Sequence, residues 1–166
     1  MSRAFVKEDS APDEDPPERP VSSHPNYMTP RGVRLLRERE TALDAQWAAL
    51  SGAQEDPERR RRKRVLERDL RYVRARLESA LPVNPAAAPK GEVRFGARVV
   101  LRRAGAADFA VRIVGEDEAE EGGEFVSWMS PLAQALLGLK PGQSFDDPNA
   151  GAGVVVAVEY DPAAAG

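Results

Sequence analysis

The strongest constraint on the fold of this chain is a pair of apolar seams on either side of one short polar turn. The first seam advances by alternating steps of three and four residues and is interrupted once, by Glu40; its apolar members are Val33, Leu36, Leu43, Trp47 and Leu50. The second seam has the same spacing and consists of Leu66, Leu70, Val73 and Leu77. Such spacing places side chains on one face of a helix, so two helices can pack seam against seam. The sequence therefore predicts an antiparallel α-helical coiled-coil hairpin over residues 29–81, with Trp47 in its core.

The ends of both helices carry recognisable signals. Thr29 can cap the first helix, Pro30 suits the first helical position, and the Ser-Gly pair at 51–52 ends the helix. Two helices of about 21 residues, rising 1.5 Å per residue, give an arm about 30 Å long. Toward the turn the second seam would continue through Lys63 and Arg59, whose charges predict a polar, splayed end.

Two segments beside the hairpin lack the pattern of a core. Residues 1–28 are acidic and rich in proline, and this composition predicts a disordered tail of which only Tyr27 and Met28 pack against the helices. Residues 82–91 hold three prolines among alanines and are predicted to be a linker.

Residues 92–162 carry the alternating, β-branched pattern of strands. Four such segments predict an antiparallel sheet. A short helix between the third and fourth opens with Ser130 as cap and Pro131 at its first position, and stops at Gly138. The whole chain is thus predicted to be α+β. The acidic run 116–124 is predicted to be a solvated hairpin turn, because nothing forces its carboxylates to converge.

Composition excludes several classes of active site. The chain has no cysteine and one histidine, His24, which excludes disulfides, thiolate metal sites, a cysteine nucleophile and any site built on several histidines. No nucleophile–base pair is visible. No apolar run approaches the roughly 20 residues that span a bilayer, and the first residues lack the apolar core of a signal peptide. We therefore expect a soluble, cytoplasmic protein.

Four sequence blocks point to one family. "TPRG" opens the first helix, and "RIVGEDEAE", "SWMSPLAQALLG" and "VVVAVEY" follow in the C-terminal part. In this order and spacing they resemble the Gre transcription elongation factors over about residues 28–162. The opening "MSRAFVKED" and the segment "RDLRYVRARLE" are nearer to GreB.

This resemblance implies a fold, a partner and a mode of action. The C-terminal domain would be FKBP-like and would bind bacterial RNA polymerase, while the coiled coil would enter the secondary channel of that enzyme. Acids at the tip would help the polymerase to cleave its own backtracked transcript. The protein would be an accessory factor rather than an enzyme, and a monomer with no cofactor of its own. Any Mg²⁺ would belong to the polymerase active site.

The predicted tip departs from the family pattern G-D-x-x-E-N-A-(E/D)-Y. The candidate acids are Glu55, Asp56 and Glu58, and the arm is shorter by about 10–15 Å at 1.5 Å per residue. Two interpretations stay open. Glu55 and Asp56 could share a Mg²⁺ with the polymerase, or Asp56 could cap the second helix, with Pro57 at the first position and Glu58 complementing the helix dipole.

Two further sets of residues are candidates for contact with partners. Six consecutive cations cover every face of the second helix, and either lie solvated against the channel or contact the 3′ end of the nascent RNA: Arg59, Arg60, Arg61, Arg62, Lys63 and Arg64. The resemblance places polymerase binding at a strand-to-helix corner formed by Trp128, Met129, Ser130 and Pro131. Trp128 itself could equally be part of the core.

The sequence leaves alternatives to a cleavage-stimulating factor. One is a Gre-like regulator that occupies the channel without promoting cleavage. Another is a nucleic-acid-binding protein that uses the basic helix electrostatically, in which case affinity would fall steeply with salt in the absence of polymerase.

Overall fold

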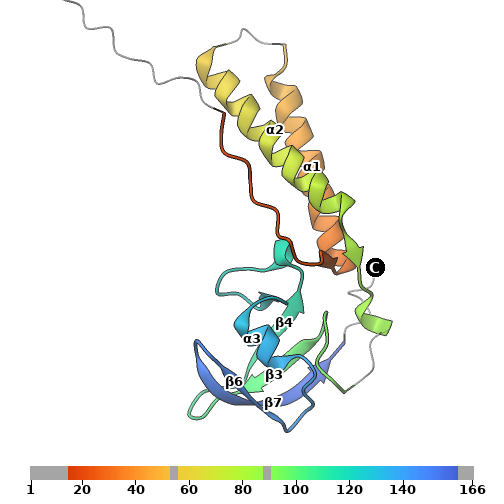
Figure 1. Cartoon of the computed structure of the whole chain (residues 1–166), viewed down its shortest axis with the longest axis vertical. Coiled ribbons are helices and arrows are strands. Elements are labelled where there is room, and N and C mark those ends of the chain that lie inside the picture. The colour runs from red at the N-terminus through yellow and green to blue at the C-terminus, as the bar shows by residue number, and fades with distance from the viewer. Residues whose placement is uncertain (1–14, 53–55, 88–90, 161–166) are drawn as a thin grey trace, which may run out of the picture.

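The computed structural model describes residues 15–52, 56–87 and 91–160. Two long helices, α1 (Pro30–Leu50) and α2 (Pro57–Glu78), form an arm that projects from a curled β-sheet carrying one short helix (Figure 1). The α+β class is as predicted. In the part of the chain that the structure describes, no helix is long and apolar enough to cross a membrane.

Both arm helices begin as their sequence signals predict. The backbone N–H of Gly32 donates to Thr29 Oγ1 at 3.1 Å, and Pro30 follows the cap. At the start of α2 the N–H of Arg59 donates to Asp56 Oδ1 at 2.8 Å. Each cap satisfies one of the amide groups that have no partner within the helix.

The two helices lie side by side and run in opposite directions (Figure 1). The seam buries Leu36 and Leu43 of α1 against Leu70 and Val73 of α2, and Met28 closes the base. Burying each such side chain stabilises the packed state by roughly 1.5–3 kcal/mol. These contacts supply most of the apolar packing between the helices.

The prediction that Trp47 lies in the core between the helices is wrong. Its side chain is 38% exposed, and its indole N–H donates to Glu67 Oε1 at 3.1 Å. The reason is the polar character of α2 toward the turn, which offers Trp47 a carboxylate instead of an apolar partner. A further polar link between the helices joins Arg74 Nε to Glu40 Oε1 at 2.8 Å.

The sheet has five strands in the order β5-β4-β3-β7-β6. Its strands are β3 (Arg98–Arg102), β4 (Phe109–Val114), β5 (Phe125–Ser127), β6 (Ser144–Asp147) and β7 (Gly151–Glu159). Neighbouring strands are antiparallel except β4 and β5, which are parallel with Arg112 opposite Phe125. A bulge between Val100 and Leu101 interrupts the register with β7 and bends the sheet.

The prediction of four antiparallel strands is therefore wrong in two respects. Residues 115–124 do not form a hairpin turn; they carry the chain back along β4 to Arg112, so that β5 runs parallel to the second half of β4. β6 was not predicted, because its sequence, Ser-Phe-Asp-Asp, offers only one apolar side chain, Phe145, to the core.

One apolar core lies under the curled sheet. The helix α3 (Pro131–Leu136) buries Ala133 and Leu136 against it. The buried strand residues are Val99, Leu101, Val111, Ile113, Phe145 and Val155. This core gives the sheet domain its own hydrophobic interior, separate from the seam of the arm.

Residues 15–26, here called the N-terminal strap, run in an extended conformation beside α2 (Figure 1). The strap continues into β1 (Tyr27–Met28), which pairs in parallel with β2 (Leu81–Pro82), and a short 3₁₀ turn, η1 (Pro85–Ala87), follows. A disordered tail does not describe residues 15–26, where Arg64, Asp69 and Arg71 of α2 oppose Asp15, Arg19 and Glu18. Met28 is buried against the helices, as expected. The remainder of the predicted tail, residues 1–14, lies outside the described residues.

Candidate functional site

The tip of the arm lies between the end of α1 and the start of α2. Of the three candidate acids there, Glu55 lies outside the described residues. Asp56 uses Oδ1 to cap α2, and Glu58 is exposed in the first helical turn. Negative charge in this position complements the positive end of the helix dipole. The described part of the tip therefore has the geometry of a helix cap.

The described residues contain no group of three or more histidine or acidic side chains arranged to hold a metal ion. A carboxylate at the tip would therefore need further ligands from a partner to bind Mg²⁺. Asp56 retains a second carboxylate oxygen, which is the donor type that Mg²⁺ prefers.

The six cations of α2 lie along its first two turns. Arg60, Arg61 and Arg62 are exposed, whereas the other three are half-buried. The Arg64 guanidinium lies 3.4 Å from the carboxylate of Asp15 in the strap. Part of this positive charge is thus already opposed by acids of the same chain.

A hollow separates the helices near the turn. Its lining combines the end of α1 with the start of α2: Gln46, Ala49, Leu50, Glu58, Arg61, Arg62, Val65 and Leu66. The hollow agrees with the splayed end expected from the cationic seam positions. Its lining brings Arg61 and Arg62 together with the apolar residues Leu50, Val65 and Leu66.

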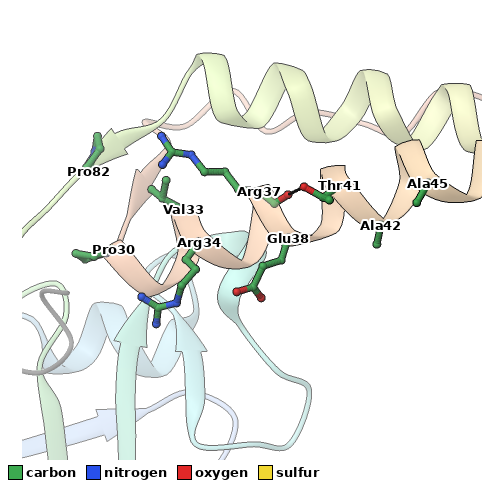
Figure 2. Close-up of a pocket in the computed structure, with 9 residues that line it drawn as sticks. All are labelled: Pro30, Val33, Arg34, Arg37, Glu38, Thr41, Ala42, Ala45 and Pro82. Carbon is green, nitrogen blue, oxygen red and sulfur yellow. Dashed lines mark hydrogen bonds between the residues drawn. The ribbon is translucent and has the colours of Figure 1, made fainter.

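A second hollow lies on the outer face of α1 (Figure 2). Thr41 donates its hydroxyl hydrogen to the Arg37 carbonyl oxygen at 3.0 Å, within the helix itself. The remaining lining is mostly aliphatic, with Val33, Ala42 and Ala45 among it. No convergent set of polar groups is directed into this hollow, so it has no features of a reactive site.

The strap contacts α2 through alternating charges. Glu18 Oε1 accepts a hydrogen bond from Arg71 at 2.5 Å, and this bond raises the pKa of the Arg71 guanidinium. Arg19 lies 4.1 Å from the centre of the Tyr72 ring, a cation–π distance. The strap thereby covers one side of the arm from the turn end to the base.

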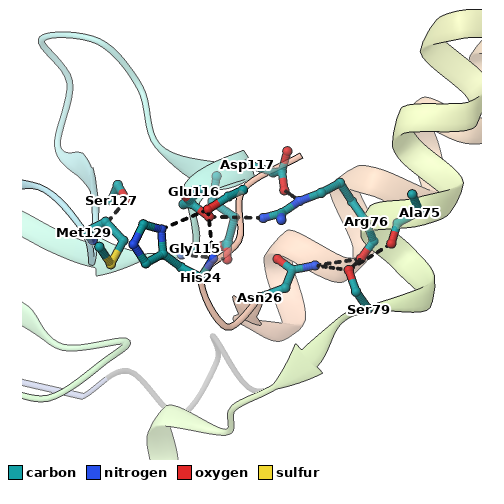
Figure 3. A network of polar contacts seen from close by, with 12 residues as sticks. His24, Asn26, Ala75, Arg76, Ser79, Gly115, Glu116, Asp117, Ser127 and Met129 are labelled. Carbon is teal, nitrogen blue, oxygen red and sulfur yellow. Dashed lines mark hydrogen bonds and ion pairs between the residues drawn. The ribbon is translucent and has the colours of Figure 1, made fainter. Parts of the chain in front are cut away.

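At its base the arm meets the 3₁₀ turn η2 (Glu116–Glu118), which follows β4 (Figure 3). The Arg76 side chain is only 2% exposed. Its Nε donates to Asp117 Oδ2 at 2.5 Å, and its Nη2 lies 3.5 Å from Glu116 Oε2. Asn26 of the strap donates to the Arg76 carbonyl oxygen at 2.7 Å. This buried arginine therefore joins α2, η2 and the strap.

The same turn also holds the start of α1. Glu118 is buried, and its carboxylate accepts hydrogen bonds from both the backbone N–H and the hydroxyl of Thr29. Tyr72 of α2 donates to Asp117 Oδ1 at 2.6 Å. Burial, and then this hydrogen bond to a carboxylate, raise the pKa of Tyr72 to about 12.

The prediction that residues 116–124 form a solvated loop is thus wrong for Asp117 and Glu118. A run of acids usually indicates a solvated loop. Here, however, Asp117 and Glu118 have partners that are distant in sequence. Arg76 and Thr29 lie 41 and 89 positions away from their respective partners. The sequence offered one indication of these contacts. A hydroxyl residue, Thr29, and a basic residue, Arg76, stand at the ends of the arm helices and could pair with an acidic turn.

The corner at 128–131 joins β5 to α3. Ser130 caps α3 by accepting from the Ala133 N–H at 3.2 Å, with Pro131 at the first position. Trp128 is half-buried and lies edge-on to Tyr27, with 5.2 Å between ring centres. Met129 is also half-buried, and its N–H donates to Ser127 Oγ at 3.1 Å. The corner is thus a capped, partly exposed segment that contacts Tyr27 next to the strap.

Comparison with known proteins places this sequence in a family. A profile described as "Transcription elongation factor, GreA/GreB, C-term" matches residues 88–158. Transcription elongation factor GreB of Neisseria meningitidis (strain Z2491) is 33% identical over 132 residues, covering 70% of this chain and 81% of that protein. GreB of Pasteurella multocida is 34% identical over 136 residues, covering 74% and 84%.

Among solved structures, the GreA/GreB elongation factor of Nitrosomonas europaea is 24% identical and covers 81% of this chain and 98% of that chain, with a TM-score of 0.38. The sequence relationship to the GreB proteins extends over most of their length and includes the arm as well as the sheet domain. The chain belongs to the GreA/GreB family of transcription elongation factors.

Proposed function

We propose that this protein binds RNA polymerase with its sheet domain and extends its helix pair into the secondary channel of that enzyme. It acts there as an accessory factor, as a cytoplasmic monomer without intrinsic catalysis. In this proposal the arm is a coiled-coil hairpin (29–81), joined by a linker (82–91) to an FKBP-like domain (92–162). The observation that carries the proposal is the arm itself, a helix pair of 21 and 22 residues anchored at one end to a separate domain.

The corner at 128–131 is the proposed contact with the polymerase. Trp128 and Met129 offer half-buried apolar surface, and the cap of α3 holds Ser130 and Pro131 in a fixed conformation. Rigid, partly apolar surface of this kind loses little conformational entropy when it binds. The tip would then lie about 30 Å from the base of the arm, at 1.5 Å per residue.

At the tip, the proposed role of Glu55 and Asp56 is to help hold a Mg²⁺ of the polymerase while a water attacks the transcript. The cations Arg59–Arg64 would lie along the channel, near the 3′ end of the nascent RNA. Stimulated cleavage is therefore the activity to test first.

The cap geometry favours a second candidate, a channel-binding regulator that does not stimulate cleavage. One carboxylate oxygen of Asp56 already accepts a hydrogen bond from the Arg59 N–H. Glu58 lies in the first turn of α2, where its charge complements the helix dipole. A general nucleic-acid-binding function is less well supported, because acids of the same chain already oppose Arg64, Arg71 and Arg74.

A transcript-cleavage assay on a stalled, backtracked elongation complex separates these candidates. A cleavage factor shortens the transcript from its 3′ end in a Mg²⁺-dependent reaction. A non-cleaving regulator leaves the transcript intact but still competes for the channel with a cleavage-competent GreB. If the protein neither cleaves nor competes, the proposal is wrong.

A further inference from the structure

Both helices of the arm are attached to the same short turn of the sheet domain. On the α1 side, Glu118 accepts hydrogen bonds from the Thr29 N–H and hydroxyl and from the Gly115 N–H, the last at 3.3 Å. Its carboxylate therefore connects the cap residue of α1 to the end of β4. Because Glu118 is buried, these bonds are shielded from competition by water.

On the α2 side, the neighbouring carboxylate performs the equivalent role. Asp117 accepts from Arg76 Nε through one oxygen and from the Tyr72 hydroxyl through the other. Tyr72 and Arg76 are one helical turn apart, so Asp117 bridges two successive turns of the same face. Two consecutive residues of η2 thus hold the two helices at their common base.

Close packing at the base adds a steric restraint. A methyl group on Gly32 would lie 2.3 Å from the Glu118 carboxyl carbon, and one on Gly115 would lie 2.4 Å from the Tyr27 carbonyl oxygen. Neither distance is possible for a real side chain. At Gly115 the clash is with the backbone, so only glycine lets the end of β4 approach β1 as closely as it does. At Gly32 the clash is with the Glu118 side chain, which would have to leave its place.

From these contacts we infer that Asp117 and Glu118 are positioning residues that fix the direction of the arm relative to the sheet domain. This inference rests on the proposed function, in which a docked domain must aim the arm into a channel. An arm of about 30 Å magnifies any change at its base, since a rotation of roughly 10° moves the tip by about 5 Å. The turn η2 therefore controls where the tip lies.

The direction of the arm can be measured in the free protein by pulsed electron spin resonance. The chain has no cysteine, so two introduced cysteines carry the only spin labels. Ala48→Cys on α1 and Ala152→Cys on β7, both exposed, report the distance across the base. Arg39→Cys and Arg61→Cys report a distance within the arm.

Gly32→Ala is the principal test variant. Alanine favours a helix more than glycine does, yet its methyl group expels the Glu118 carboxylate from its bonds with Thr29. We expect the distance distribution across the base to shift or broaden, while the distribution within the arm and the helical circular dichroism stay unchanged. Thr41→Ala is the matched control, because its hydroxyl donates to the Arg37 carbonyl oxygen within α1, away from the base.

Asp117→Ala is the second variant and should broaden the same distribution from the α2 side. Its control, Asp108→Asn, alters a carboxylate that pairs with Arg102 at 2.7 Å wholly within the sheet domain. Unchanged distributions across the base in both Gly32→Ala and Asp117→Ala would overturn the inference, since β1–β2 pairing would then suffice to orient the arm.

Binding to purified polymerase tests the consequence separately. If the proposed function is right, Gly32→Ala weakens binding to polymerase by about tenfold or more, whereas Thr41→Ala stays within about twofold. If neither the native chain nor any variant binds polymerase, the proposed function fails, but the distance measurements still decide whether η2 orients the arm.

Discussion

Arg76 of α2 donates its Nε hydrogen to Asp117 Oδ2 of η2 at 2.5 Å, across the boundary between the arm and the sheet domain. Its side chain is almost wholly removed from solvent. A buried charge of this kind is tolerated only when it is paired and hydrogen-bonded. The pair therefore makes the arm and the sheet domain energetically dependent on each other.

Removing one partner of this pair should be costly. Asp117→Ala leaves Arg76 buried with only the more distant Glu116, and we expect the free energy of unfolding to fall by about 3 kcal/mol. Denaturant unfolding followed by circular dichroism measures the change. Arg74→Ala removes an exposed pair with Glu40 and Asp44 and should have a much smaller effect; equal losses would contradict the role of the buried pair.

Tyr72 should titrate far above an ordinary tyrosine. Its pKa of about 12, against 10.0, means that the folded state favours the neutral phenol. The resulting stabilisation is complete below pH 10 and is lost as the pH rises toward 12. The tyrosinate absorbance of the native chain minus that of Tyr72→Phe should therefore rise near pH 12. A midpoint near pH 10 would show that Tyr72 is neither buried nor hydrogen-bonded to Asp117 as described.

The two interpretations of Asp56 can be separated by one substitution. Asp56→Ser keeps a side chain that caps a helix but removes the carboxylate. If the tip supports cleavage, this variant should lose most of the stimulation of transcript cleavage while unfolding as the native chain does. Asp56→Ala, in contrast, should also lose about 1 kcal/mol of stability because the cap is gone. Cleavage by Asp56→Ser at the native rate would exclude a metal-binding role for this residue.

The corner at 128–131 should control affinity for the polymerase. Met129→Asp combined with Pro131→Ala places a carboxylate where apolar surface is proposed to be buried, and we expect binding to weaken by about tenfold. Surface plasmon resonance on immobilised polymerase measures this, and an unchanged melting temperature shows that the domain remains folded. Asp146→Asn, on the exposed side of β6, is the control. Native affinity in the double variant would place the contact elsewhere.

The N-terminal strap should matter little for this binding. Deleting residues 1–20 removes the exposed contacts of Asp15 and Glu18 and the half-buried contact of Arg19 with α2, but retains Asn26 and β1. Exposed ion pairs contribute little to stability, so polymerase affinity should stay close to that of the full chain. A large loss of affinity would show that the strap or the residues before it take part in binding.

The helix starts could be predicted from the sequence because their signals are local. A cap residue followed by proline occurs at Thr29-Pro30, Asp56-Pro57 and Ser130-Pro131, and each pair begins a helix in the structure. The seam residues away from the turn could also be predicted, since helical spacing decides which side chains share a face; Trp47, nearer the turn, was the exception.

Contacts between distant segments could not be predicted in the same way. The acids of η2 look like a solvated loop until Arg76 and Thr29 are brought to them by the fold. Likewise, the parallel direction of β5 depends on where the chain returns after η2. The position of the strap depends on the charged side chains along α2. Each of these features follows from tertiary structure, and nothing in the local sequence specifies it.

The central claim, that the arm enters the secondary channel, is tested most directly by a fluorescent label near the tip. We would attach the label at Arg61→Cys, add purified polymerase, and measure collisional quenching by iodide, with Ala152→Cys on the sheet domain as the comparison. If the arm enters the channel, polymerase shields the label at position 61 and leaves the label at position 152 largely accessible. Equal quenching at position 61 with and without polymerase, under conditions where the complex forms, would contradict it.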